Sequence, residues 1–158
     1  MITSEEFDYR TAAAVLGASA PGILDEIRAI LADPARELNF VLQGKQRNLS
    51  AQVQEWFAHR GWEKESPSLA IPDMRYDLVK GRIPMEIELG HQRLVFPDFF
   101  KFMANYSRGM IPAAVVVVTG EPTRFGHTWH CSMASTRRKI EAVSEVFLVP
   151  LLVVAVDP

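Results

Sequence analysis

The sequence lacks several features that would place it outside the ordinary globular proteins. Its single cysteine, Cys131, cannot form an internal disulfide, which favours a reducing compartment and a cytoplasmic protein. The acidic first residues lack the basic and apolar parts of a signal peptide. The longest apolar stretch, residues 146–156, is about half of the roughly 20 residues that a membrane-spanning helix needs, so we expect no membrane partner.

The sequence also lacks an excess of positive charge, internal repeats and Gly/Ser-rich linkers. The formal net charge is −2, so any surface that binds nucleic acid must be a local one. With 158 residues, of which 48% are apolar, the chain is long enough for one well-packed core. We therefore expect a single domain over residues 1–158.

The apolar pattern changes from helical to strand-like along this domain. Apolar residues recur at helical spacing in residues 23–31 and 49–60, which predicts a helical N-terminal part over residues 1–62. A catalytic hairpin and sheet follow over residues 69–158. The predicted order there is strand 75–79, strand 83–89, a helix ending near Gly109, strand 111–118, helix 132–145 and strand 146–156. Such an order favours an α/β fold with a mixed central sheet and helices on both faces.

The hairpin carries the most informative side chains. If Gly81 and Arg82 form a two-residue turn, counting outward from it places Asp77 opposite Glu86. Glu88 then lies two positions further along the same face of the strand. The three carboxylates would converge on one patch of a rigid hairpin, where their charges repel each other.

A hard divalent cation relieves such repulsion, because clustered oxygen ligands are what Mg²⁺ accepts. Bound Mg²⁺ polarises phosphate oxygens and activates water, so hydrolysis of phosphodiesters is the natural chemistry of this patch. The spacing leaves an alternative open, in which the acids belong to a solvated strand face and Asp77 forms a salt bridge with Lys80 or Arg82.

An Asp at the end of one strand followed by Glu-x-Glu on the next resembles the core of the PD-(D/E)XK nuclease superfamily. The stretch Asp77-Leu-Val-Lys-Gly-Arg-Ile-Pro-Met-Glu-Ile-Glu-Leu-Gly-His, with its aromatic-rich helix at residues 99–103, resembles the BglII/BamHI-like branch of type II restriction endonucleases. The resemblance implies a restriction-endonuclease-like fold with three layers, α/β/α. It also implies that Asp77, Glu86 and the Ile87 carbonyl bind the metal, and that Glu88 is a ligand or a base toward the attacking water. Most of the superfamily has Lys at the position of Glu88.

The candidate DNA contacts are cations near the hairpin, since phosphates must be neutralised on one face. They are Lys45, Arg47, Arg82, His91 and Arg93, with Arg137, Arg138 and Lys139 as a further group. Gln52 and Glu55 are candidates for an outer contact with the metal site. A zinc site at His127, His130 and Cys131 is disfavoured, because structural zinc sites have four ligands.

Together, the residues and the resemblance predict a Mg²⁺-dependent endonuclease that hydrolyses DNA phosphodiester bonds. Cleavage of both strands of a duplex favours a homodimer, which supplies two active sites. The alternatives are a non-catalytic DNA-binding or protein-interaction subunit of the same fold, or a structure-selective repair nuclease.

Overall fold

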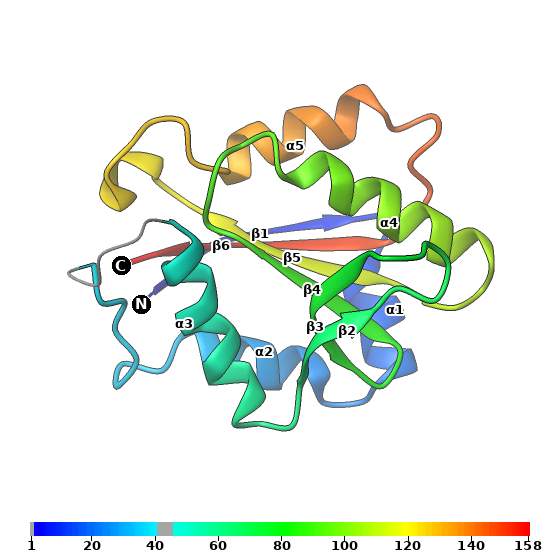
Figure 1. The fold of residues 1–158 in the computed structure, drawn as a ribbon, viewed down its shortest axis with the longest axis horizontal. Helices are drawn as coiled ribbons and strands as arrows, with labels where there is room; N and C mark the ends of the chain where they lie inside the picture. Colours follow the sequence, from blue (N-terminus) through cyan, green and yellow to red (C-terminus); the bar gives the residue numbers. More distant parts are fainter. Residues whose placement is uncertain (1, 41–45) are drawn as a thin grey trace.

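The structure is a computed structural model that describes residues 2–40 and 46–158, and its centre is a six-stranded mixed sheet (Figure 1). The strand order across the sheet is β1-β6-β5-β4-β3-β2. The strands are β1 (Ile2–Tyr9), β2 (Glu63–Pro67), β3 (Arg75–Lys80), β4 (Ile83–Glu88), β5 (Ala114–Thr119) and β6 (Leu151–Asp157). Strands β4, β5 and β6 run parallel, and the other neighbours pair antiparallel.

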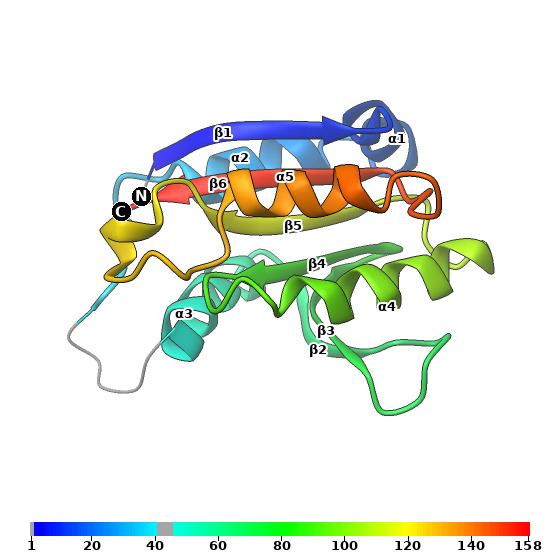
Figure 2. The ribbon, with the colours of Figure 1, turned by 90° about the horizontal axis from the view of Figure 1, so that it is seen from above.

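Helices cover both faces of the sheet, which confirms the predicted α/β fold with three layers (Figure 2). One face carries α1 (Ala12–Ser19), α2 (Ile23–Leu31) and α3 (Gln46–Ala58), and the other carries α4 (Val95–Ser107) and α5 (Met133–Ala142). A short 3₁₀ helix, η1 (Pro122–Phe125), follows β5. No helix in the described part of the chain is long and apolar enough to cross a membrane.

Two interior strands of the sheet, β5 and β6, explain why it is stable. Every residue of β5 and β6 is buried. Their side chains alternate between the two apolar cores, with Val115 and Val117 on one face and Val116 and Val118 on the other. Continuous apolar runs of this kind are typical of parallel strands covered on both sides.

The two edge strands were not predicted, and the description of residues 1–62 as helical is wrong for its first segment. Residues 2–9 form β1, which pairs antiparallel with β6 and has a bulge between Thr3 and Glu5. At the other edge, β2 lies outside the predicted range 69–158. Both strands are rich in charged residues, which edge strands tolerate because one side faces solvent. The alternation of apolar and polar residues is therefore weak in these two segments.

The turn of the β3–β4 hairpin agrees with the prediction. Gly81 has a φ of +59°, a left-handed value that suits glycine at the first position of a two-residue turn. Lys80 pairs with Ile83, and the register continues through Val79–Pro84 to Leu78–Met85. The hairpin therefore carries Asp77 toward Glu86, as the count from the turn predicted.

Candidate active site

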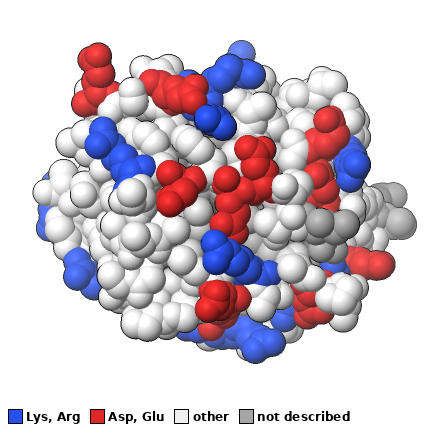
Figure 3. Space-filling model, turned by 180° about the vertical axis from the view of Figure 1, so that it is seen from behind, with Lys and Arg blue, Asp and Glu red and all other residues white. Residues whose placement is uncertain are grey.

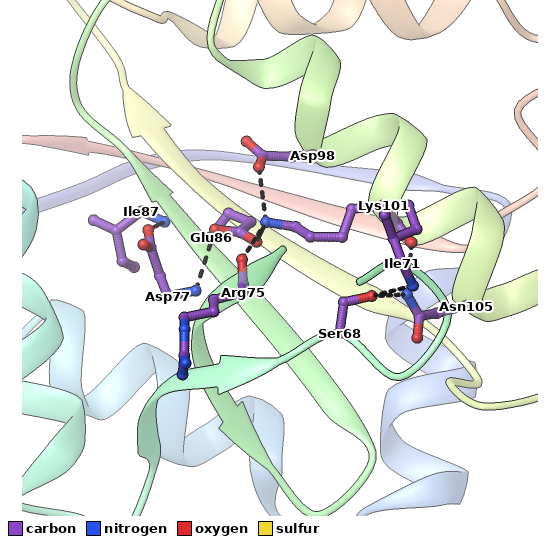
Figure 4. A network of polar contacts seen from close by, with 9 residues as sticks. All are labelled: Ser68, Ile71, Arg75, Asp77, Glu86, Ile87, Asp98, Lys101 and Asn105. Carbon is purple, nitrogen blue, oxygen red and sulfur yellow. Dashed lines mark hydrogen bonds and ion pairs between the residues drawn. The ribbon is translucent and has the colours of Figure 1, made fainter. Parts of the chain in front are cut away.

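Strands β3 and β4 separate immediately beyond Leu78 and Met85, and two acids occupy the gap. The backbone N–H of Asp77 donates to Glu86 Oε2 (3.3 Å), and the backbone N–H of Ile87 donates to Asp77 Oδ2 (2.8 Å; Figure 4). Asp77 and Glu86 are therefore adjacent but are not a regular cross-strand pair, because their carboxylates replace the ladder bonds at this point. We call this place, formed by Asp77 and residues 86–88, the fork.

Helix α4 contributes a second pair of charged residues to the fork. Lys101 Nζ forms ion pairs with Glu86 and with Asp98 (3.2 Å), and it donates a hydrogen bond to the Arg75 carbonyl (2.7 Å; Figure 4). Glu86, Asp98 and Lys101 are all buried. The sequence analysis singled out this helix only for its aromatic residues and did not assign its two charged residues to the site.

The acids of the fork have raised pKa values, because burial disfavours their charged forms. Burial, the charge of Asp98 and a hydrogen bond with Asp98 raise the pKa of Glu88 to about 10. Burial raises the pKa of Asp98 to about 6, although Lys101 lowers it. Burial and the charge of Asp98 raise the pKa of Glu86 well above its ordinary value, and burial also raises that of Asp77. The buried acids of the fork therefore hold their protons more tightly than exposed carboxyl groups do.

The predicted cluster of three metal-binding carboxylates is not preformed. Within residues 2–40 and 46–158, no three His, Cys, Asp or Glu side chains are arranged to hold a metal ion. The reason is that Lys101 pairs with Glu86, while Glu88 is hydrogen-bonded to Asp98. The donor chemistry nevertheless fits a hard divalent cation, because the fork offers the carboxyl oxygens of Asp77, Glu86 and Glu88 and the carbonyl oxygen of Ile87.

Helix α3 forms the wall of a pocket of about 440 Å³ beside the fork. Ser50 donates to the Ile87 carbonyl (2.7 Å), and the buried Gln54 side chain is hydrogen-bonded to Asp77. The predicted outer contacts lie elsewhere on the helix: Gln52 binds the backbone of Asn39, and Glu55 forms an ion pair with Lys64. The sequence therefore indicated the correct helix, but the side chains nearest the fork come from a different part of its circumference.

Glu65 is a pocket residue that sequence reasoning missed. The pairing of β2 with β3 passes from Lys64–Leu78 to Ser66–Tyr76, so Glu65 lies unpaired beside Asp77. It has a φ of +51°, lines the pocket, and its charge raises the pKa of Asp77. No signal in the sequence pointed to Glu65, because the strand that carries it was not predicted.

The predicted DNA contacts do not all lie at the pocket. His91 lines it, and Arg93 is exposed two residues further along the chain. Arg82 lies at the turn of the hairpin, where its guanidinium donates to the carbonyls of Gly109 and Met110. Lys45 and the side chain of Arg47 lie outside the described residues. Acidic and basic side chains are interspersed on the face that Figure 3 shows.

The alternative interpretation of Asp77 as a surface salt-bridge partner is wrong. Lys80 forms its ion pair with Glu26 on α2 (2.8 Å), and the guanidinium of Arg82 binds backbone carbonyls. In the further basic group, Arg137 pairs with Glu141 on its own helix, and Lys139 donates to the Gln92 carbonyl.

Comparisons with known proteins agree with this fold. A family profile described as restriction endonuclease BglII/BglIII matches residues 4–156. The crystal structure of restriction endonuclease BglII complexed with a DNA 16-mer has a TM-score of 0.76 and 15% sequence identity, over 96% of this chain and 75% of that chain. At this identity, the structural match shows the fold alone. No curated protein sequence matches the chain. The extent of the profile match shows that this chain belongs to the BglII/BglIII family of restriction endonucleases, which are DNA-hydrolysing enzymes.

Proposed function

We propose that this endonuclease cleaves duplex DNA at the fork, with Mg²⁺ as its cofactor. The proposal rests on the contacts of Asp77 and Glu86 where β3 and β4 separate. There the Glu86 carboxylate accepts from the Asp77 N–H, and the Asp77 carboxylate accepts from the Ile87 N–H. Two acids with raised pKa values are costly to bury, so the pair indicates a function rather than a contribution to stability. The adjacent pocket gives a phosphate access to Asp77 and Glu88.

The residues of the fork have distinct roles in this proposal. Asp77, Glu86 and the Ile87 carbonyl hold the ion, whose chemistry when bound is to polarise a phosphate oxygen and activate a water. Glu88 lines the pocket and accepts or holds a proton beside the attacking water. Ser50 and Gln54 fix the Ile87 carbonyl and the Asp77 carboxylate from α3.

Contacts with DNA are proposed at the rim of the pocket. His91 lines the pocket, and the exposed side chain of Arg93 follows it, so both can reach a phosphate beside the fork. Lys45 and Arg47 precede the part of α3 that forms the pocket wall and are kept as further candidates. Arg82 is a weaker candidate, because its guanidinium binds carbonyls at the other end of the hairpin.

A homodimer is proposed as the assembly that cuts both strands. Large apolar side chains are exposed on α4, at Phe96 and Phe100, and after α5, at Val146 and Leu148. These two helices cover the same face of the sheet (Figure 2). Exposed apolar side chains grouped in this way are typical of protein interfaces. Sedimentation at micromolar concentration tests the proposal, and a monomer with and without DNA would contradict it.

A plasmid-cleavage assay with and without Mg²⁺ tests the proposed chemistry. We expect cutting with Mg²⁺, and binding without cutting when Ca²⁺ replaces it, because the larger ion positions the water poorly. Duplex, branched and single-stranded DNA should be compared in the same assay. Cleavage of branched DNA alone would favour a structure-selective nuclease. Tight binding without cleavage under any divalent ion would contradict the proposal.

A further inference from the structure

Lys101 is an unusual residue in the described part of the chain. It is the one lysine or arginine there that is buried, with 4% of its surface exposed. A lysine side chain is seldom buried unless it is paired, because its ammonium group loses its hydration. The position of Lys101 on α4, against the fork, therefore requires specific partners.

The ammonium group has three acceptors, which matches its three N–H donors. They are the Glu86 carboxylate, Asp98 Oδ1 at 3.2 Å and the Arg75 carbonyl at 2.7 Å. The nitrogen also lies 5.0 Å from the centre of the Tyr76 ring. Contacts from β3, β4 and α4 thus fix the group in one place (Figure 4).

Lys101 brings a positive charge to the fork from a different element than the motif on β4. Glu88 stands where most of the PD-(D/E)XK superfamily has Lys, so β4 itself brings only acids to the fork. The positive charge comes instead from α4, at helical i, i+3 spacing from Asp98.

We propose that Lys101 is a positioning residue for DNA hydrolysis, an inference that rests on the proposed function. Lys101 holds the Glu86 carboxylate at the fork in the orientation that the reaction uses. The pocket is lined by Asp77, Ile87 and Glu88, whereas Lys101 lies behind Glu86. It therefore acts through Glu86 and not on the DNA. Its charge also keeps the acids of the fork together before a metal ion binds.

The test compares Lys101→Met and Lys101→Arg with a control, Lys80→Met. Lys80 also forms an ion pair, with Glu26 on α2 (2.8 Å), away from the fork. Three quantities are measured: the single-turnover cleavage rate with saturating Mg²⁺, the Kd for DNA with Ca²⁺, and the Tm in EDTA. The last two do not depend on cleavage by the metal-loaded enzyme.

We expect Lys101→Met to cut about 100-fold more slowly, because misplaced catalytic groups cost about this much. Its Kd for DNA should stay within about threefold of the wild type, since Lys101 does not face the pocket. Its Tm in EDTA should fall, and added Ca²⁺ should raise it more than in the wild type. Lys101→Arg should restore much of the rate, because it restores the charge. Lys80→Met should lower the Tm and leave the cleavage rate unchanged.

A folded Lys101→Met that cuts at the wild-type rate would overturn the positioning role, as would an equal loss of rate in Lys80→Met. If Lys101→Met does not fold, Lys101→Gln combined with Asp98→Asn removes one cation and one anion together. This double variant should fold and still lose about 100-fold in rate, and wild-type cutting by it would overturn the role. Failure of the wild-type protein to cut any DNA would instead reject the proposed function.

Discussion

At each end of the β3–β4 hairpin a lysine lies against acidic side chains, but the pKa values of these acids are shifted in opposite directions. At the turn, the backbone ladder is complete and Lys80 pairs with Glu26 at the surface. There, burial raises the pKa of Glu26, but hydrogen bonds from Lys80 and Trp62 outweigh it, so the pKa is lowered. At the fork, the ladder stops, the acids are buried, and their pKa values are raised.

The acid at the turn end contributes to the stability of the fold, whereas the acids at the fork form the candidate active site. The acid at the turn is stabilised as a carboxylate, so its ionisation supports the fold. Burial disfavours the ionised form of the acids at the fork, and a bound cation would stabilise that form, as expected for a metal-binding site. Variants at the two ends should therefore separate the effects on catalysis from those on stability.

The largest expected effect concerns the acids at the fork. Asp77→Asn or Glu86→Gln should reduce Mg²⁺-dependent cleavage by about a thousandfold or more, since each removes a group that acts directly in the reaction. The metal-free fold of Asp77→Asn should be as stable or more stable, because one repelling charge is lost, whereas Glu86→Gln removes the buried ion-pair partner of Lys101 and should lower the Tm. Plasmid cleavage and the Tm in EDTA measure the two quantities.

Glu26→Gln is the control for these two variants, because it removes an acid on α2 that pairs with Lys80 at the turn end of the hairpin, away from the fork. It should cleave DNA at the wild-type rate. Full activity in Asp77→Asn or Glu86→Gln would contradict the assigned site. A fall in the Tm of Asp77→Asn in EDTA would contradict the view that the charges at the fork repel each other.

The sequence predicted the centre of the fold and the adjacency of Asp77 and Glu86 for clear physical reasons. The continuous apolar runs of β5 and β6 are stable in a folded protein only when both faces of these strands are buried. Gly81 fixed the turn, and the turn fixed the register from which the position of the two acids follows. Local patterns determine all of these features.

The remaining features depend on contacts between distant segments. The edge strands β1 and β2 have a weak pattern because one side of each faces solvent. Asp98 and Lys101 are charged residues on an otherwise apolar helix, and only the packing of α4 against β4 makes them partners of the fork. Glu65 reaches the pocket through an irregularity in β2 that composition does not indicate.

The next largest effect is the contribution of Glu88 and Asp98, at the fork, to the pH dependence of the free energy of unfolding. In EDTA, the folded protein retains protons on Glu88 and Asp98 that the unfolded chain releases above its ordinary carboxyl pKa. The free energy of unfolding should therefore fall from about pH 5 to about pH 9, by at most about 1.4 kcal/mol per pH unit for each proton. Glu88→Gln should make this dependence shallower. Urea unfolding measures it, and an equal slope in the variant would contradict the assignment.

A smaller effect concerns DNA binding, to which Arg93 near the fork should contribute and Arg82 at the turn of the hairpin should not. Arg93→Ala should weaken binding in Ca²⁺ and reduce the slope of log K against log salt by about one, as for the loss of a single phosphate contact. Arg82→Ala should leave that slope unchanged, because its guanidinium binds carbonyls at the turn. Binding titrations at several salt concentrations measure both slopes. A larger change for Arg82→Ala would place the DNA at the turn instead of the fork.

The smallest expected effect is at Glu26, where the pH dependence has the opposite sign. Burial raises the pKa of Glu26, but hydrogen bonds from Lys80 and Trp62 and the charge of Lys80 outweigh it, so the pKa is lowered. Its contribution is therefore present above the ordinary carboxyl pKa of 4.5 and is lost as the pH falls through the lowered value. Because the ion pair is partly exposed, Glu26→Gln should cost less than about 1 kcal/mol near neutral pH. Urea unfolding of both proteins should show this difference shrinking toward pH 3, whereas a difference that stays constant would mean that the ionisation of Glu26 contributes nothing.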